Sequence, residues 1–446
     1  MTQSTRSRRL ATGVAAFLAS IAALPARGDT VDASSTTMQI VRDQNRAGQL
    51  FTIAPLYELV SISARNVQNP VADDLAFVVS GWAGLSLGTN LVWYDANPPQ
   101  HNLFGDLDLA FAQGELLKRS VQLRLGRQVV GGGVAGTLQL DGGSVLLRLP
   151  AGFGVTAYVG APVAQRFHGG GSPISFNPNV GDFAVGGRAY WTLPRWGEIG
   201  FSGIEIRDRG DPGREQVGGD LRFTPVRLVT VLANSNYDLH EARWAEANGV
   251  LQFQLLGGKL VAAADVRHVE PDLLLSRTSI LSVFSMDKRN EIGGSLQYGE
   301  WRALTFGADY HYLVRPDQGV GHRVNGRAVW QPRSTTSVGV EVGHNSFYTN
   351  QSGAFLNNGY FTIRGFASQE YKRFTGSLDL QDYEFQQNIN NYDRSFTAIA
   401  TLGYAIGCGW SALVSGDAGV TPYYQSRYGL MVRLAYNQSY HFREVR

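Results

Sequence analysis

Residues 427–442, which read RYGLMVRLAYNQSYHF, decide the fold class of this chain. Apolar or aromatic side chains occupy every second position from Tyr428 to Phe442, interrupted once at Gln438, and the alternate positions carry mostly polar or small residues. A period of two predicts a β-strand with one apolar and one polar face. Strands of soluble sheets usually have about five or six residues. A strand of this length instead fits the ~9–11 residues that a tilted strand needs to cross a membrane.

The same alternation recurs upstream, for example at residues 183–193 and 396–404. The connections between such segments alternate between short ones, such as Pro194–Arg195, and long ones, such as Val163–Gly181. Outer-membrane β-barrels have short periplasmic turns, longer external loops and aromatic girdles at both membrane interfaces. Five tryptophans lie within a few residues of the short connections: Trp191, Trp196, Trp301, Trp330 and Trp410.

These patterns predict an all-β fold, a transmembrane outer-membrane antiparallel β-barrel of about 18 strands, with 18–20 strands from the count of alternating segments. The composition agrees with this prediction. Glycine accounts for 53 of the 446 residues, and charged residues make up only 17%, against about 25% in soluble domains. A barrel of this width is expected to enclose an aqueous lumen.

The first 28 residues have the pattern of a secretory signal peptide, with basic residues, an apolar run at Leu10–Leu24 and a small-x-small site at Ala26–Gly28. We therefore expect residues 1–28 to be a signal peptide, 29–49 a short periplasmic N-terminal segment and 50–446 a single barrel domain. The expected location is the outer membrane of a Gram-negative bacterium. Loss of the four arginines of the signal peptide changes the formal net charge from +2 to −2, which excludes a basic surface for nucleic acid.

The segment Gly126-Arg127-Gln128, followed by Asp141-Gly142, resembles the alginate-export type of outer-membrane porin. The surroundings of Tyr57-Glu58 and Gly81-Trp82 also resemble myxobacterial polysaccharide-secretion β-barrels. This resemblance implies a barrel of 18 strands that exports an exopolysaccharide or capsular polysaccharide to the cell surface. It also implies a periplasmic polysaccharide-export protein as a partner, beside the outer-membrane lipid and the polysaccharide itself.

Charged residues at the polar positions of the predicted strands are expected to line the lumen. The predicted lumen and polymer-contact residues are Arg124, Arg148, Arg188, Arg222, Arg267, Arg323, Arg327, Arg433, Asp106, Asp108, Asp220, Asp265, Asp309, Glu341 and Asp379. Both signs are present, whereas the alginate exporter uses a basic conduit. Facing opposite charges can pair and brace the wall, and leave weak hydrogen-bonding sites for sugar hydroxyls.

The connection at residues 271–286 is long and unusually apolar for an external loop. Its apolar residues include Leu273, Leu274, Leu275, Ile280, Leu281 and Phe284. An apolar segment exposed to water needs cover, and an apolar constriction can gate a pore by dewetting. One hypothesis is that this segment folds into the lumen as a gate. The other is that it packs on its neighbours or extends a strand.

We expect no enzyme, no cofactor and no metal site. The arrangement closest to catalysis is His344-Asn345-Ser346, where His and Ser share one face of a strand. Outer-membrane lipid hydrolases use a His-x-Ser arrangement, but Phe347-Tyr348 replaces the residues that follow it in those enzymes. Polysaccharide export is therefore the main prediction, a general diffusion porin for small solutes is the alternative, and a lipid hydrolase is a distant third.

Overall fold

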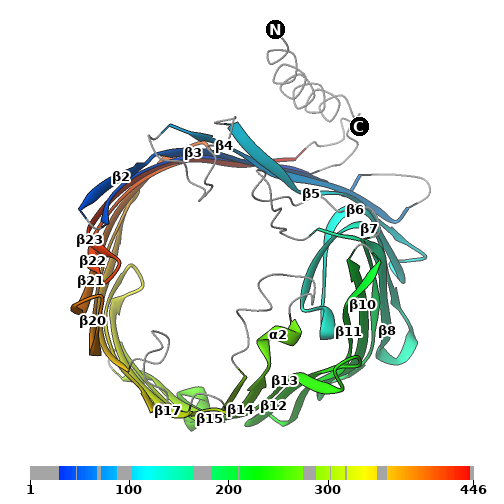
Figure 1. The fold of residues 1–446 in the computed structure, drawn as a ribbon. Helices are drawn as coiled ribbons and strands as arrows, with labels where there is room; N and C mark the ends of the chain where they lie inside the picture. The colour runs from blue at the N-terminus through cyan, green and yellow to red at the C-terminus, as the bar shows by residue number, and fades with distance from the viewer. Residues whose placement is uncertain are drawn as a thin grey trace.

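The computed structural model describes residues 30–46, 48–67, 72–87, 103–163, 182–208, 210–274, 288–301, 303–316, 319–348 and 359–441. The expected signal peptide, residues 1–28, lies outside this part. The described strands form one antiparallel sheet that closes on itself, because Thr30 of the first strand pairs with His441 of the last (Figure 1). The structure therefore confirms the predicted all-β barrel.

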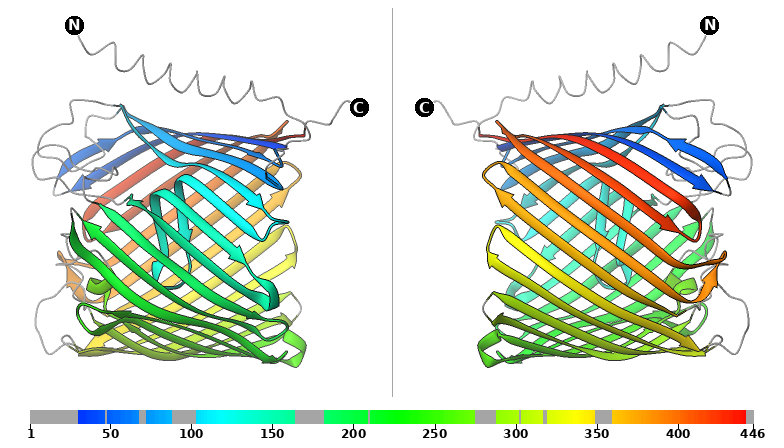
Figure 2. Two further views of the ribbon diagram at one scale, coloured as in Figure 1. Left: turned by 90° about the vertical axis from the view of Figure 1, so that its right-hand side faces the viewer. Right: turned by 90° about the vertical axis from the view of Figure 1, so that its left-hand side faces the viewer.

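The element bounds are β1 (Thr30–Arg46), β2 (Gln49–Ile53), β3 (Pro55–Arg65), β4 (Asp74–Ser86), β5 (Leu103–Leu116), β6 (Val121–Gly131), η1 (Gly133–Ala135), β7 (Thr137–Arg148), η2 (Pro150–Gly152), β8 (Phe153–Pro162), β9 (Phe183–Leu193), β10 (Gly197–Asp208), β11 (Asp211–Val226), β12 (Val229–Asp238), β13 (Arg243–Leu255), η3 (Leu256–Gly258), β14 (Leu260–Val269), α2 (Pro271–Leu274), β15 (Arg289–Trp301), β16 (Leu304–Arg315), β17 (Gly319–Arg333), β18 (Thr336–Tyr348), β19 (Tyr360–Tyr371), β20 (Phe374–Ile389), β21 (Tyr392–Gly407), β22 (Trp410–Thr421) and β23 (Tyr424–His441). The strands run obliquely around the wall (Figure 2). No helix among the described residues is long and apolar enough to span a membrane.

The described residues form a wall of 22 strands, so the expected numbers of 18 and 18–20 were wrong. The strands β2 and β3 are two parts of one wall strand, because both pair with β1 and only Ala54 separates them. The even number agrees with the rule for bacterial outer-membrane barrels.

The strand β1 was missing from the sequence-based count. Residues 29–49 were expected to precede the barrel, whereas Thr30–Arg46 pairs with β23 on one side and with β2 and β3 on the other. Its lipid-facing positions include Ser35, Thr37 and Gln39, so the strand shows no continuous apolar face in its sequence. Main-chain pairing on both sides places it in the wall despite this polar pattern.

Residues that are paired across two strands lie on the same face of a sheet. Following the pairing from strand to strand therefore identifies all positions that lie on one face of the barrel. This set carries large apolar side chains that project outward, such as Leu125 and Phe201, which are 68% and 67% exposed. Leu430 and Trp191 belong to the same set. An apolar outer surface around a closed wall is the surface that lipid requires. The protein is an outer-membrane β-barrel.

Short turns gather at the end of the barrel where β1 begins and β23 ends. Trp191, Trp330 and Trp410 lie near these turns at lipid-facing positions, and Trp196 lies in one of the turns. All four are between 40% and 56% exposed. The side chain of Trp301 lies outside the described part. Tryptophans gathered at one rim are what an interfacial girdle requires.

Candidate functional site

The register places most of the predicted lumen residues on the inner face of the barrel. Lumen-facing positions hold Arg124, Arg148, Arg188, Arg222, Arg267, Arg323, Arg327, Arg433, Asp220, Asp265, Asp309, Glu341 and Asp379. Asp106 and Asp108 instead lie beside a register shift in the ladder between β4 and β5. The carboxylate of Asp106, on β5, lies 3.3 Å from the guanidinium of Arg127 on β6.

Many of the lumen charges form ion pairs along the wall. Arg188 contacts Glu198 at 2.6 Å and also binds Asp220. Arg364, which the sequence analysis did not single out, donates to Asp379 at 3.0 Å and lies 3.8 Å from Glu341. Pairs of this kind brace the wall and reduce the charge that a solute meets.

Other lumen arginines have no ion-pair partner in the part of the chain that the structure describes. Arg222, Arg267 and Arg433 make no ion pair with another described residue. These three arginines lie at lumen-facing positions, where a guanidinium group offers five N–H donors.

The residues of the Gly-Arg-Gln motif meet across β6 and β7, with Arg127 and Asp141 on the lipid-facing side and Gly126, Gln128 and Gly142 at positions of the inner face. Arg127 donates to both carboxylate oxygens of Asp141, at 2.7 and 2.8 Å, from a lipid-facing position near the loop end of β6. Gly126 has a φ of +122°, and a Cβ there would lie 2.1 Å from the carbonyl oxygen of Ala110. The motif thus joins β6 to β5 through a close backbone approach and to β7 through a bidentate ion pair. Gln128 is fully buried and donates to the carbonyl oxygen of Gly142 at 3.2 Å.

The connection between β6 and β7 folds onto the inner wall at η1. Val134, at 1% exposure, packs with Leu140, Tyr158 and Ile204 in the largest buried apolar cluster among the described residues. Its N–H donates to the hydroxyl oxygen of Ser202 on β10 at 2.9 Å. The barrel wall therefore carries a small apolar core on its lumen side, and this core holds η1 in place.

Helix α2 is the second segment that lies inside the ring of strands (Figure 1). Its Leu273 is 5% exposed, and the Leu273 carbonyl oxygen accepts a hydrogen bond of 2.6 Å from the side-chain amide of Gln216 on β11. The oxygen of the same amide accepts a bond of 2.9 Å from Arg214 Nε. Arg214 Nη2 in turn donates to the carbonyl oxygen of Val134 at 2.6 Å. The two inward segments are thus joined through Arg214 and Gln216.

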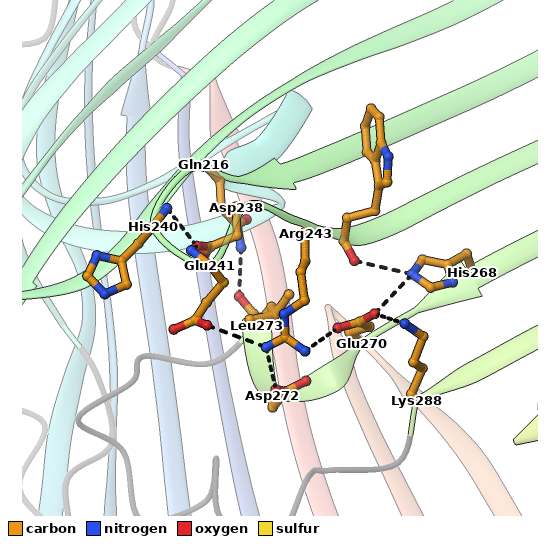
Figure 3. A network of polar contacts seen from close by, with 11 residues as sticks. Gln216, Asp238, His240, Glu241, Arg243, His268, Glu270, Asp272, Leu273 and Lys288 are labelled. Carbon is orange, nitrogen blue, oxygen red and sulfur yellow. Dashed lines mark hydrogen bonds and ion pairs between the residues drawn. The ribbon is translucent and has the colours of Figure 1, made fainter. Parts of the chain in front are cut away.

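Ion pairs fix the start of α2 as well (Figure 3). Arg243 Nη1 contacts Glu270 at 2.9 Å, and Arg243 Nη2 lies 3.7 Å from Asp272. The Glu270 side chain is only 3% exposed and also binds Lys288 and, at 3.5 Å, His268. A buried carboxylate is costly unless cations surround it. Glu270 therefore anchors both the residues before α2 and the residue that precedes β15.

The remaining predicted residues are placed as follows. Leu273 and Leu274 belong to α2, whereas Leu275, Ile280, Leu281 and Phe284 lie outside the described residues. His344 and Ser346 both occupy lipid-facing positions of β18, and Ser346 is 7% exposed. Within the described part of the chain, no group of His, Cys, Asp and Glu side chains is placed to hold a metal ion.

Sequence reasoning missed Arg214 and Gln216, although both occupy the polar positions of β11. Alternation alone shows that they face the lumen. It does not show that η1 and α2 fold back onto them, because that contact depends on the path of two connections far away in the sequence.

No model of a known protein family matches this chain, and no curated protein is similar to it. Among solved structures, OccAB4 of Acinetobacter baumannii is similar with a TM-score of 0.46 and 10% identity, covering 93% of this chain and 99% of that chain. The outer membrane protein OpdK of Pseudomonas aeruginosa gives 0.45 and 11%, covering 92% and 99%. A BenF-like porin from Pseudomonas fluorescens Pf-5 gives 0.45 and 11%, also covering 92% and 99%.

Proposed function

We propose that this protein is a passive outer-membrane channel for small hydrophilic solutes, with a lumen narrowed by η1 and α2. The observation that carries the proposal is the chain of hydrogen bonds from Val134 through Arg214 and Gln216 to Leu273. A wall of 22 strands is too wide for its own side chains to fill. Segments that fold inward and are fixed to one side of the wall narrow the pore.

The wall chemistry supports water-soluble cargo. Charged side chains on the inner wall, such as Arg188, Asp220 and Arg433, keep the lumen hydrated. Transport requires that a solute binds well enough to enter and weakly enough to leave. A mixed polar wall without one dominant site meets this condition.

Reconstitution into lipid vesicles tests the proposal. Purified full-length protein should admit small sugars and amino acids, with rates that fall steeply as solute size increases, and should conduct ions in planar bilayers without a partner. A folded barrel that neither conducts nor admits any of these solutes would overturn the proposal.

Polysaccharide export, with a periplasmic export protein as partner, is the second candidate function. The observation that favours it is the width of a wall that has 22 strands rather than 18. Deletion of the gene distinguishes the two functions. Accumulation of polymer in the periplasm would support export, whereas normal surface polymer with slower uptake of small solutes would support the diffusion channel.

A further inference from the structure

A hollow of about 460 Å³ lies in the wall formed by β15–β18. Most residues around it occupy lumen-facing positions, and they include Gln297, Thr305, Asp309, Asn325, Arg327 and Glu341. This volume falls within the usual range for small-molecule sites, about 300–1,000 Å³. The hollow lies apart from η1 and α2, because none of its lining residues belongs to those segments.

One lumen-facing position that lines the hollow, Gly307, has no side chain. Gly307 lies in register between Gln297 on β15 and Arg327 on β17. A Cβ at Gly307 would meet no heavy atom nearer than 3.9 Å, the carbonyl oxygen of Leu296. The glycine is therefore not required by backbone crowding, and the space above it is open to the lumen.

Arg327 and Glu341 are direct cross-strand neighbours, yet they form no ion pair with each other. The Arg327 guanidinium lies over the ring of Phe366, 5.2 Å from its centroid, and this ring covers Gly339. The Glu341 carboxylate lies 3.8 Å from Arg364 instead. Both groups thus have other partners, and both also line the hollow.

Donors and acceptors alternate around the hollow. Asn325 donates to Asp309 at 2.9 Å, so a carboxylate and an amide lie side by side opposite the Arg327 donors. An anionic solute would be repelled by Asp309 and Glu341, and a cationic solute by Arg327. A hydroxyl group both donates and accepts, so vicinal hydroxyls match this mixture without a charge penalty.

We propose that this hollow is a weak binding site for a neutral sugar of about one or two rings, which would give the channel a preference among small solutes. The inference rests on the proposed function, since it names the solute class of the same lumen. Gln297 and Arg327 would bind sugar hydroxyls as donors, and Asp309 and Glu341 would accept from them.

Three probes of one skeleton test the charge argument: glucose, gluconate and glucosamine, each added to protein in planar bilayers. Glucose should reduce or modulate the ion current at a concentration about five- to tenfold lower than either charged probe, the ratio expected from about 1–1.4 kcal/mol. Stronger block by gluconate or by glucosamine would overturn the neutral-sugar assignment. Equal block by all three would show that the hollow does not select solutes.

A matched pair of variants locates the effect. Gly307→Gln should fill the hollow and remove the preference for glucose, while Ser415→Gln, at a lumen-facing position of β22 outside the hollow, should retain it. Heat-modifiable mobility on gels reports whether each barrel is folded. If Gly307→Gln is folded, conducts ions and keeps the preference, the site is elsewhere. If even the unmodified protein does not conduct, the proposed channel function itself fails, which is a separate outcome.

Discussion

Gln216 on β11 donates its side-chain amide to the carbonyl oxygen of Leu273 in α2 at 2.6 Å, and both residues are buried. The NH2 group of this amide therefore binds a segment inside the lumen, while its oxygen accepts a hydrogen bond from Arg214. Because Arg214 also binds Val134, a single wall position influences two inward segments that are 139 residues apart in the sequence, Val134 and Leu273.

Replacing Gln216 by leucine should widen the pore. The variant removes the bond to Leu273 and leaves Arg214 Nε without its acceptor. Loss of a hydrogen bond should lower the free energy that holds α2 against the wall by about 0.5–1.5 kcal/mol. The time that the pore spends in wider states should therefore increase about 2- to 10-fold. Single-channel recording measures this as a larger mean conductance with more switching between levels. Gln254→Leu, at a lumen-facing position of β13, is the matched control, and an equal change there would remove Gln216 from the mechanism.

The ion pairs at the start of α2 predict a non-additive effect. Arg243→Met removes the contacts with Glu270 and Asp272 and should also increase the conductance, because it weakens the hold on α2 by about 1–3 kcal/mol. If Arg243 and Gln216 hold the same helix, the conductance of the double variant should be only slightly larger than that of the single variant with the stronger effect. Fully additive effects in bilayer recordings would mean that the two residues act on different parts of the pore.

The ion pair between Arg127 and Asp141 predicts a loss of stability without a change in the pore. Arg127→Met removes a bidentate contact at a lipid-facing position, and this should cost about 1–3 kcal/mol. The temperature at which the barrel unfolds on heat-modifiable gels should fall, while the conductance of the folded protein stays the same. Arg124→Met, which removes a lumen-facing arginine of the same strand, serves as the comparison, since it should alter ion selectivity instead.

The sequence predicted the barrel because nearly every strand from β4 to β23 carries one continuous apolar face. It did not predict β1, since Ser35 and Thr37 occupy lipid-facing positions and bind the carboxylate of Glu58 on β3. Polar side chains on the lipid side are acceptable here because they satisfy one another. Alternation therefore detects a strand whose two faces meet lipid and water. It does not detect a strand whose lipid-facing side chains are polar and form hydrogen bonds with their neighbours.

The candidate site was predictable only in part, for a related reason. Alternation places Arg188, Asp220 and Arg327 at lumen-facing positions, because the period of a strand fixes the face of each residue. The constriction depends instead on Val134 and Leu273, whose positions follow from how two connections fold back onto the wall. The unusual apolar content of residues 271–286 was the one signal of this arrangement, and the described part of that stretch, α2, lies inside the barrel.

The single cysteine of the chain provides a test of orientation. Cys408 is exposed in the turn between β21 and β22, at the end of the barrel that holds the short turns. The long connections from β4 to β5, from β8 to β9 and from β18 to β19 all lie at the opposite end, and the longer loops of outer-membrane barrels are external. A membrane-impermeant maleimide should therefore not label Cys408 in intact cells and should label it after the outer membrane is permeabilised. Asn390→Cys in a Cys408→Ser background places the thiol in the turn between β20 and β21, at the opposite end. This variant should be labelled in intact cells. The reverse labelling pattern at the two positions would show that the barrel has the opposite orientation in the membrane.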